Sequence, residues 1–501
     1  MAITVTIIGA GSLTFTQRLV RDILGVPEFQ NAHFRYTDVD KTGLERAVAL
    51  TKKDIDENQL AATVMGSQNR REALEGANYV INCTRIGGLS AFEHDIEIPL
   101  KYGVDQCVGD TLCIGGIMYG QRGIAALEEF CIDINEVASP DCLLLNYGNP
   151  NAMLVWAANE FFGVNCVGLC HGVQGGHHQI AEVIQLLVNK GRKPGSRGFT
   201  PVSHKDVDII CAGINHQTWY IQVRYQGEDW TDRLLEGFEK HPYFSKTEKC
   251  RIDMLRRFGY YSTESNGHLS EYLPWYRKSP AETRRWIDKS SWIHGETGGY
   301  LRICTETRNT FNQDFPKWMK AERYDVFTQP RSQEHGSYII EALETGRAYR
   351  GHFIVVNNGS ITNLPEDVVV EVPGYVDRNG IAIPIVGDLP LACTATLSAS
   401  TQVQRMAVHA AVTGDLTLLK QAVLHDPLTA TICTTEAVWQ MVDEMLVAQA
   451  KWLPQFSEDV ADAKRRLAAA KRSGDYRGTS RNKGAFRKAV KAVKAADEAS
   501  W

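Results

Sequence analysis

Residues 4–16, TVTIIGAGSLTFT, constrain the fold of this chain more than any other stretch. Residues 5–8 form a short, mostly β-branched run that is typical of a buried parallel strand. A glycine-containing turn follows at 9–12, and apolar residues then recur at helical spacing over 13–24. The order strand, glycine turn, helix predicts a pyrophosphate site. Its glycines allow the tight turn and let a phosphate approach the free N–H groups of the helix N-terminus.

A second strand that ends in an acid strengthens this prediction. Residues 34–38, FRYTD, place Asp38 where dinucleotide-binding folds hold the adenosine ribose hydroxyls, and an acid there favours NAD over NADP. The third glycine of the usual fingerprint is missing, because Thr14 stands in its place, so an ordinary strand-to-helix turn is the alternative. We expect the NAD contacts to come from the turn, the start of the helix and the acid: Gly9, Gly11, Ser12, Leu13 and Asp38.

Strand and helix patterns alternate as far as about residue 200, which is typical of a parallel sheet covered by helices. Further strands are predicted at 61–65, 79–83, 142–145 and 164–169. Helices are predicted at 41–57, at 91–102 and from 121 onward, with a glycine-rich substrate loop between the last two. The fold class predicted here is therefore α/β, with an N-terminal Rossmann-like, doubly wound parallel sheet.

The pattern changes after residue 208 to that of an α+β domain covering the carboxyl edge of the sheet. Antiparallel strands are predicted over 209–225, two strands at 368–372 and 375–376, and a long helical region at 395–452. Three domains follow from this: an NAD-binding domain at 1–200, a substrate, metal and oligomerisation domain at 201–456, and a basic helical tail at 457–501. The tail, rich in Ala, Lys and Arg, is predicted to form two solvated helices or a subunit-contact arm.

Composition excludes several classes of protein. A chain of 501 residues with a formal net charge of -5 is too long for one ordinary core and does not present a chain-wide nucleic-acid surface. The start resembles no secretion signal, and no apolar run is long enough for a bilayer, so we expect a cytoplasmic protein without membrane partners. The twelve cysteines lack paired metal-finger spacing and are expected to be reduced and mostly buried.

Cys170 and His216 are the candidate metal ligands. Each follows a predicted strand on the same edge of the sheet, and a thiolate with an imidazole suits a soft divalent metal whose remaining ligands are oxygens. A buried cysteine is more often only a small hydrophobe, which is the alternative. Asn149 precedes Pro150 and is therefore kept from helical geometry, so its amide can project from a strand end. Tyr272 lies in an aromatic-rich stretch and becomes a useful base only if a cation lowers its pKa.

Taken together, these motifs resemble those of the NAD- and divalent-metal-dependent glycosidases of glycoside hydrolase family 4. Within that family, the chain resembles the branch of α-galactosidases, α-galacturonidases and α-glucuronidases. The resemblance runs from the first strand to about residue 456. It rests on IGAGSLTF, TDVD, EGANYVIN, IGG (86–88), GDTLCIGGI, LNYGNPNAM, VGLCHGVQG, AGINH, TESNGHLSEYLPWY, NLPEDVVVEV and KWLP.

The resemblance implies NAD and a divalent metal, for which we expect manganese, as cofactors. In this chemistry NAD takes a hydride from C3 of the sugar and returns it, a base removes the C2 proton, and the glycosidic bond breaks by elimination. The roles it implies are metal binding by Cys170 and His216, substrate binding by Asn149 and Asp110, proton donation by His171, and proton abstraction by Tyr272, with His268 or Glu271 as alternatives.

The resemblance favours a neutral α-galactoside over a hexuronide. A uronic acid would need a charge-assisted partner, for which Arg85, Arg277 and Arg331 are candidates. Cys113-Ile114 replaces the Gly-Pro typical of the galactosidase branch and is expected to alter the pocket near the C6 end of the sugar. A net NAD-dependent dehydrogenase of the lactate/malate type and a non-catalytic sugar or nucleotide sensor are the alternatives. The expected partners are a small glycoside and further copies of this chain, in a homodimer or homotetramer.

Overall fold

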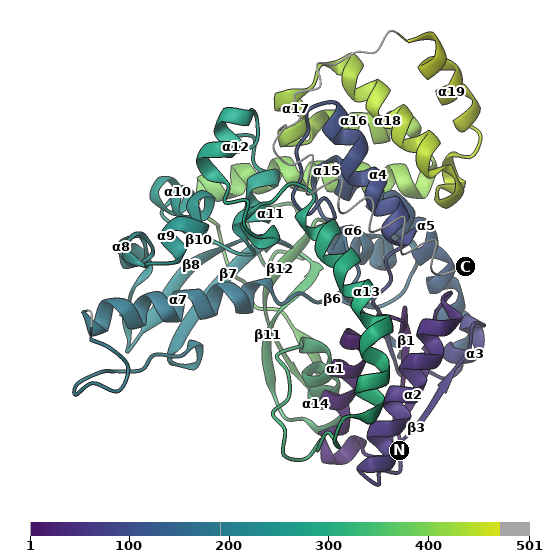
Figure 1. Cartoon of the computed structure of the whole chain (residues 1–501), viewed down its shortest axis with the longest axis vertical. Coiled ribbons are helices and arrows are strands. Elements are labelled where there is room, and N and C mark those ends of the chain that lie inside the picture. The colour runs from purple at the N-terminus through teal and green to yellow at the C-terminus, as the bar shows by residue number, and fades with distance from the viewer. Residues whose placement is uncertain (1, 191, 471–501) are drawn as a thin grey trace.

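The computed structural model describes residues 2–190 and 192–470 of the chain, and its centre is a single mixed β-sheet (Figure 1). The main path of the sheet has the strand order β10-β8-β7-β12-β11-β6-β5-β4-β1-β2-β3, with β13 beside β12 and β9 beside β8. The strands are β1 (Thr4–Ile8), β2 (His33–Thr37), β3 (Thr63–Gly66), β4 (Tyr79–Asn82), β5 (Leu143–Asn146), β6 (Cys166–Gly168), β7 (Val207–Ile214), β8 (Gln217–Tyr225), β9 (Glu228–Asp229), β10 (Tyr261–Ser262), β11 (Tyr349–Val356), β12 (Val369–Asp377) and β13 (Gly380–Ala382).

The first six strands are parallel and confirm the predicted doubly wound fold. β1 lies between β2 and β4, the order reverses at β1, and β5 and β6 follow on the β4 side. β1, β4, β5 and β6 are buried along their whole length, which explains their nearly continuous apolar sequences. The carboxyl ends of β1 and its neighbours meet at one edge, where open α/β sheets bind ligands.

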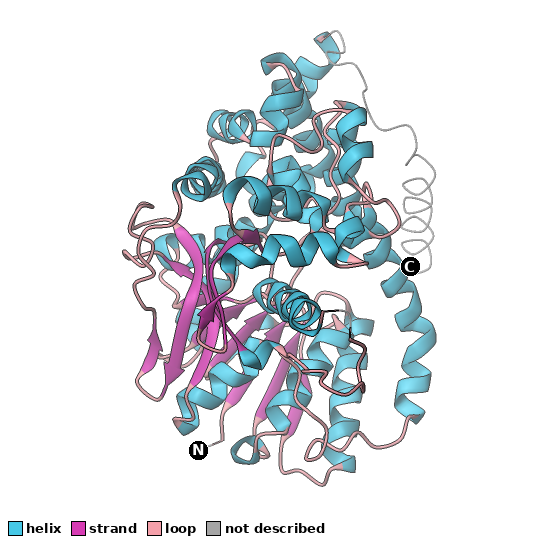
Figure 2. Cartoon of the chain, turned by 90° about the vertical axis from the view of Figure 1, so that its left-hand side faces the viewer, coloured by secondary structure: helices cyan, strands magenta, loops and turns pink. Residues whose placement is uncertain are grey.

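Helices cover both faces of this sheet and form a cap beyond its carboxyl edge (Figures 1 and 2). They are α1 (Leu13–Leu24), α2 (Lys41–Glu57), α3 (Arg70–Leu74), α4 (Gly88–Lys101), α5 (Cys113–Val137), α6 (Asn151–Trp156), α7 (Gly172–Asn189), α8 (Leu234–Lys240), α9 (Phe244–Thr247), α10 (Lys249–Phe258), α11 (Asn266–Tyr272), α12 (Pro280–Trp286), α13 (Gly299–Lys320), α14 (His335–Thr345), α15 (Leu391–Thr413), α16 (Leu416–His425), α17 (Pro427–Ile432), α18 (Thr435–Gln449) and α19 (Val460–Ala469). Figure 1 shows α13 running from the cap down toward α2, and α13 is in contact with both α4 and α2.

The second half of the chain extends the same sheet in antiparallel fashion. β7 and β8 form the predicted hairpin, and β11 pairs with both β6 and β12, so the parallel and antiparallel parts are continuous. The two strands predicted at 368–372 and 375–376 are one strand, β12. Its pairing with β11 continues through Pro373, which lies opposite His352. Helices α15 to α18 occupy the predicted helical region.

The glycine-rich segment after α4 was expected to be a loop up to residue 121, and this expectation is wrong. Helix α5 begins at Cys113, and its glycines allow close packing inside the fold. A Cβ on Gly116 would lie 2.4 Å from the carbonyl carbon of Thr111, and one on Gly120 would lie 2.8 Å from the sulfur of Met153. Helix propensity is outweighed here by tertiary contacts.

The proposed domain boundaries stay predictions, since the sheet runs across the first of them. Of the predicted basic tail, α19 is described, and residues 471–501 lie outside the described residues. No helix among residues 2–190 and 192–470 is long and apolar enough to cross a membrane.

Candidate active site

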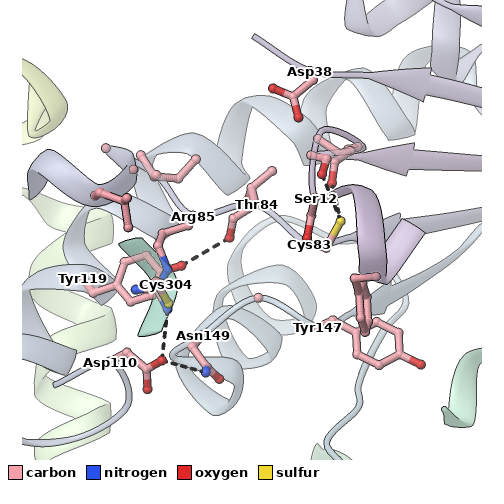
Figure 3. A pocket seen from close by; sticks show the side chains of 18 of the residues that line it. Ser12, Asp38, Cys83, Thr84, Arg85, Asp110, Tyr119, Tyr147, Asn149 and Cys304 are labelled. Carbon is pink, nitrogen blue, oxygen red and sulfur yellow. Dashed lines mark hydrogen bonds and ion pairs between the residues drawn. The ribbon is translucent and has the colours of Figure 1, made fainter. Parts of the chain in front are cut away.

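A cavity of about 1070 Å³ opens at the carboxyl edge of the parallel strands (Figure 3). One end is lined by Gly9, Ser12 and Asp38, and the other by Cys170 and His216. Much of the remaining wall comes from segments that are distant in sequence: 83–90, Asp110, Tyr119, 147–149, Glu264, His268, Trp292, Tyr300, Cys304 and Trp452. The cavity therefore joins the predicted nucleotide turn to the predicted metal ligands.

At the nucleotide end of the cavity, the carboxylate of Asp38 packs directly against the backbone of Gly11. Asp38 accepts hydrogen bonds from the backbone N–H of Gly11 and of Asp40, both at 2.8 Å, and a Cβ on Gly11 would lie 2.8 Å from Asp38 Oδ2. Burial raises the pKa of Asp38. Helix α1 has no side-chain cap, and the N–H groups of Leu13 and Phe15 donate to the backbone oxygens of Gly11 at 2.9 Å and Ser12 at 3.1 Å. The helix dipole still favours an anion at this end. Of the predicted NAD contacts, Leu13 has its side chain in the core, and Gly11 faces Asp38.

Cys170, His216 and Glu264 form a compact group at the other end. Cys170 follows β6, and its sulfur accepts the backbone N–H of Gly172 at 3.4 Å at the start of α7. His216 lies in the β7–β8 turn with a left-handed backbone, and its Nε2 is 3.2 Å from the sulfur of Cys170. Glu264 Oε2 lies 3.9 Å from that sulfur and 3.8 Å from His216 Nε2. Burial raises the pKa of the Cys170 thiol well above its usual value, so a cation would be needed to form the thiolate.

The hydrogen bonds of Asp110 and Thr111 fix the tautomer of His216. The Thr111 hydroxyl donates to Asp110 Oδ1 at 2.8 Å, so its oxygen accepts the proton of His216 Nδ1 at 2.9 Å. His216 Nε2 then presents a lone pair toward Cys170 and Glu264. Metal-binding histidines usually donate the N–H of the other ring nitrogen to a hydrogen-bond acceptor, which fixes the tautomer and the ring orientation. Cys170, His216 and Glu264 therefore fit a divalent metal.

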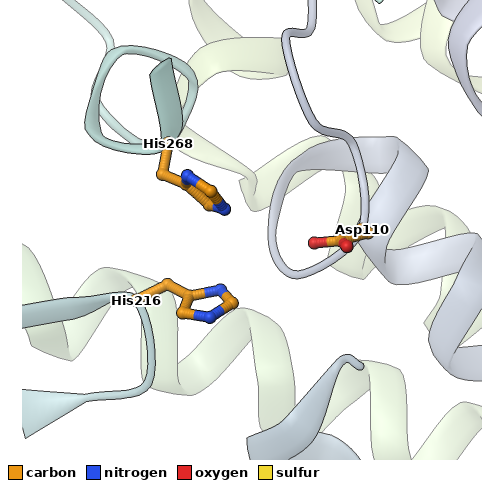
Figure 4. A group of neighbouring side chains, drawn as sticks. All are labelled: Asp110, His216 and His268. Atoms are coloured by element: carbon orange, nitrogen blue, oxygen red, sulfur yellow. The ribbon is translucent and has the colours of Figure 1, made fainter. Parts of the chain in front are cut away.

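His268 faces the cavity, whereas Tyr272 does not line it. The Asp110 carboxylate and the His216 and His268 rings point toward one another (Figure 4), and their ligand atoms also lie close enough to group around an ion. Burial lowers the pKa of His268 to about 4, so its imidazole is neutral. Tyr272 lies one helical turn farther along α11, is 1% exposed, and has its pKa raised well above 10 by burial and by Glu271.

Glu271, an alternative to Tyr272 as the base, is engaged in holding a loop. Its carboxylate accepts the backbone N–H groups of Cys107 at 2.6 Å and of Val108 and Gly109 at 3.0 Å. Burial raises the pKa of Glu271 to about 7, against the effect of the nearby Arg277. This loop carries Asp110 to the cavity, so Glu271 supports the site without facing it.

The three candidate arginines for a sugar carboxylate have different surroundings. Arg277 is fully buried and bound to Asp105, and Arg331 is bound to Glu341, so neither lines the cavity. Arg85 does line it. Its guanidinium lies over the rings of Phe92, Tyr119 and Tyr300 and donates to Asp110 Oδ2 at 3.2 Å. Burial opposes ionisation of Asp110, but Arg85 and the nearby histidines hold its pKa below the usual range.

The other predicted substrate residues are at the cavity, with one exception. Asn149 donates to Asp110 Oδ2 at 3.2 Å, and Figure 3 shows it beside Arg85 and Asp110. His171 lines the cavity with a side chain that is 68% exposed, and its Nδ1 is 4.0 Å from Glu334. Cys113 and Ile114, which were expected to alter the sugar pocket, do not line the cavity, and both are fully buried in the core at the start of α5. Their effect on the pocket stays a prediction.

Sequence reasoning did not single out Glu264 or the aromatic wall. Glu264 directly precedes Ser265, which caps α11, and an acid just before a helix carries no specific signal for metal binding. Trp292 lies in the short 3₁₀ helix η5 (Trp292–His294), Tyr300 in α13 and Trp452 in the short 3₁₀ helix η6 (Ala450–Trp452). Their common position at the cavity depends on how these segments fold back over the sheet.

Comparison with known proteins places this site in a family. The model of the family 4 glycosyl hydrolases matches residues 4–186, and that of the family 4 glycosyl hydrolase C-terminal domain matches residues 211–429. An α-galactosidase of Rhizobium meliloti (strain 1021) is 55% identical over 490 residues, covering 98% of this chain and 96% of the relative. An α-galactosidase of Bacillus subtilis (strain 168) is 30% identical over 458 residues, with 90% and 99% covered.

A solved structure shares the fold. The 6-phospho-β-glucosidase of Thermotoga maritima, crystallised with manganese, NAD+ and glucose-6-phosphate, has a TM-score of 0.71 and 23% identity, covering 90% of this chain and 99% of that one. The architecture of the sheet and cap is thus that of a known glycosidase structure. The two family models together match most of the chain, and the protein belongs to glycosyl hydrolase family 4.

Proposed function

We propose that this chain is an α-galactosidase that requires NAD and a divalent metal. The observation that carries the proposal is the single cavity that connects the nucleotide turn with the Cys170–His216 pair. A hydrolase needs a dinucleotide site beside a metal site only if oxidation and reduction of the sugar are part of the reaction. The two α-galactosidases among the relatives support the choice of substrate.

NAD, when bound, supplies the acceptor and later the donor of the C3 hydride, so it is not consumed. Ser12 and the uncapped N-terminus of α1 are suited to its pyrophosphate. Asp38 is suited to the ribose hydroxyls and would repel the extra phosphate of NADP, which supports NAD as the cofactor. Gly9 has a φ of +87°, and a side chain there would meet the backbone of Cys83 at 3.1 Å, so the turn depends on glycine.

Cys170 and His216 would hold the metal, which supplies Lewis acidity toward the sugar oxygens. We propose manganese, since a structural relative was crystallised with it. His216 is prepared for this role by Thr111, whose hydroxyl oxygen accepts the hydrogen bond of Nδ1–H and so leaves the Nε2 lone pair directed toward Cys170. A serine at position 170 would be a poorer ligand for the metal than the cysteine thiolate, because a neutral hydroxyl binds such a cation more weakly.

We propose that His268 removes the C2 proton of the sugar and that His171 donates a proton to the leaving group. The His268 imidazole is neutral at ordinary pH, faces the cavity and is oriented by Ser265, whose hydroxyl oxygen is 2.7 Å from Nδ1. Tyr272 has a phenol that ionises with difficulty in its buried position, although it remains the alternative base. His171 stands at the exposed rim, where a leaving group would depart.

A neutral sugar suits the cavity better than a hexuronide. Arg85 is the one of the three candidate arginines that lines the cavity, and its guanidinium is already paired with Asp110. A sugar carboxylate would have to compete with that buried carboxylate. The α-galacturonidase of Thermoanaerobacterium saccharolyticum, 25% identical to this chain, makes an α-galacturonide the second candidate.

The test is a panel of p-nitrophenyl glycosides with NAD and manganese each omitted in turn. Cleavage of the α-galactoside that requires both cofactors is expected, and release of NADH in step with turnover would indicate a dehydrogenase instead. Preference for the α-galacturonide or α-glucuronide, lost in Arg85→Met, would overturn the neutral-sugar proposal.

A second measurement assigns the base. Hydrolysis in heavy water should label C2 of the released sugar, and His268→Asn should abolish labelling while NAD affinity is retained. Tyr272→Phe is the matched comparison, one turn away in the same helix. If C2 labelling is normal in His268→Asn and lost in Tyr272→Phe, Tyr272 is the base that removes the C2 proton.

A further inference from the structure

We propose that Glu264 is a third protein ligand of the metal and that Gly172 is required to admit its carboxylate. The inference rests on the proposed metal dependence and extends it to a set of one thiolate, one imidazole and one carboxylate. Glu264 lines the cavity, and its side chain is 16% exposed, so the carboxylate is reachable from the substrate side yet held by the protein.

The three ligand atoms form a nearly regular triangle. Its sides are 3.2 Å from Cys170 Sγ to His216 Nε2, 3.9 Å from Sγ to Glu264 Oε2, and 3.8 Å from Nε2 to Oε2. A point equidistant from the corners lies about 2.1 Å from each, within the range for sulfur, nitrogen and oxygen ligands of a first-row divalent metal. No rearrangement of the three side chains is therefore needed.

Gly172 gives independent support for this position of the carboxylate. A Cβ on Gly172 would lie 1.9 Å from Glu264 Oε2, closer than any stable contact. The backbone of Gly172 is ordinary helical backbone at the start of α7, so conformational freedom does not explain the glycine. Gly175, three residues along the same helix, has no atom within 4 Å of its Cβ position. Space for the Glu264 carboxylate beside Cys170 is what distinguishes the two glycines.

Charge balance favours the same arrangement. A thiolate and a carboxylate together carry two negative charges, which a divalent cation neutralises, and buried charge is tolerated only when it is compensated. Glu264 lies between β10 and α11 with a φ of +66°, a conformation that residues other than glycine rarely adopt and that is commoner at functional sites.

The experiment measures binding of manganese chloride to the NAD-loaded protein without substrate, by calorimetry and by the electron paramagnetic resonance of free Mn²⁺. Glu264→Gln keeps the size of the side chain but removes its charge. It is expected to weaken Mn²⁺ binding at least about 100-fold, because loss of a residue that only supports a metal ligand already costs about 10–100-fold. Gly172→Ala should weaken it similarly by displacing the carboxylate. Gly175→Ala is the matched control and should bind like the wild type.

Cobalt provides a second readout. Co²⁺ bound to Glu264→Gln should keep its thiolate charge-transfer band, because Cys170 is intact, while its ligand-field spectrum shifts. NAD affinity and the thermal midpoint check that each variant is folded, and Glu264→Gln alone suffices if Gly172→Ala does not fold.

Manganese affinity within threefold of wild type in Glu264→Gln would overturn the proposal. If C2 labelling were lost in that variant at the same time, Glu264 would be the base instead of a ligand. A wild-type protein that binds neither Mn²⁺ nor Co²⁺ would contradict the proposed function itself, which separates the two failures.

Discussion

Replacing Arg85 by methionine should destabilise the protein and raise the pKa of Asp110. Asp110 is 1% exposed, and its carboxylate accepts from Arg85 and Asn149 at 3.2 Å and from Thr111 at 2.8 Å. Removing one partner of a buried ion pair costs about 3–5 kcal/mol. Asn149 and Thr111 still donate to the carboxylate in the variant, so Asp110 is not left without partners. The expected loss in free energy of unfolding is therefore at the low end of this range, about 3 kcal/mol at pH 7.

The stability deficit of Arg85→Met should depend on pH, because the substitution changes the folded-state pKa of Asp110. In the wild type the folded-state pKa of Asp110 is depressed, so its contribution is present above the unfolded pKa and is lost as pH falls through the folded pKa. In Arg85→Met the folded pKa is raised by burial without the guanidinium. The deficit relative to wild type should thus be greatest at neutral pH and shrink as pH falls through the folded-state pKa of Asp110 in the variant, because protonation removes the incompletely compensated buried charge.

Urea unfolding of the two proteins between pH 4.5 and 8 measures the deficit, and the pH dependence of kcat/KM reports on the site. The acidic limb of the variant should move to higher pH. Arg331→Met is the matched control, because Arg331 also pairs with a carboxylate and stacks on a tyrosine ring but lies outside the cavity. A deficit below 1 kcal/mol that does not vary with pH would refute the reasoning.

Three further results are expected. Gly11→Ala should lower NAD affinity at least tenfold, measured by calorimetry, because its Cβ would lie 2.8 Å from Asp38 Oδ2; unchanged affinity would contradict the assigned turn. Glu271→Gln should destabilise the protein by about 2–3 kcal/mol, since an amide N–H₂ faces buried N–H donors, and hydrogen exchange at residues 107–109 should accelerate; exchange as slow as in wild type would argue against it. Cys170→Ser should lose manganese-dependent activity against p-nitrophenyl α-galactoside, and full activity without added metal would exclude Cys170 as a ligand.

Local pattern was sufficient for the first half of the fold. The bounds of α1 and α2 are as predicted, because burial on one helix face imposes the 3.6-residue period directly on the sequence. Strands β1, β4, β5 and β6 were recognised as buried apolar runs, within about two residues at their ends. Cys170 and His216 were expected at the same edge of the sheet because each follows a predicted strand, and their side chains do meet there, 3.2 Å apart. Their role as metal ligands came from the family resemblance and stays a prediction.

Other features were decided only by tertiary structure, since they depend on contacts between segments far apart in the chain. Glu264 is 94 positions from Cys170, and no local pattern signals that their side chains meet. His268 and Tyr272 are equivalent on a helical repeat and both are buried, and only the packing of α11 brings His268, but not Tyr272, to the cavity wall. The glycine at 172 likewise looks like an ordinary helix start. Its reason is a carboxylate from another part of the fold, which occupies the space that any side chain would need.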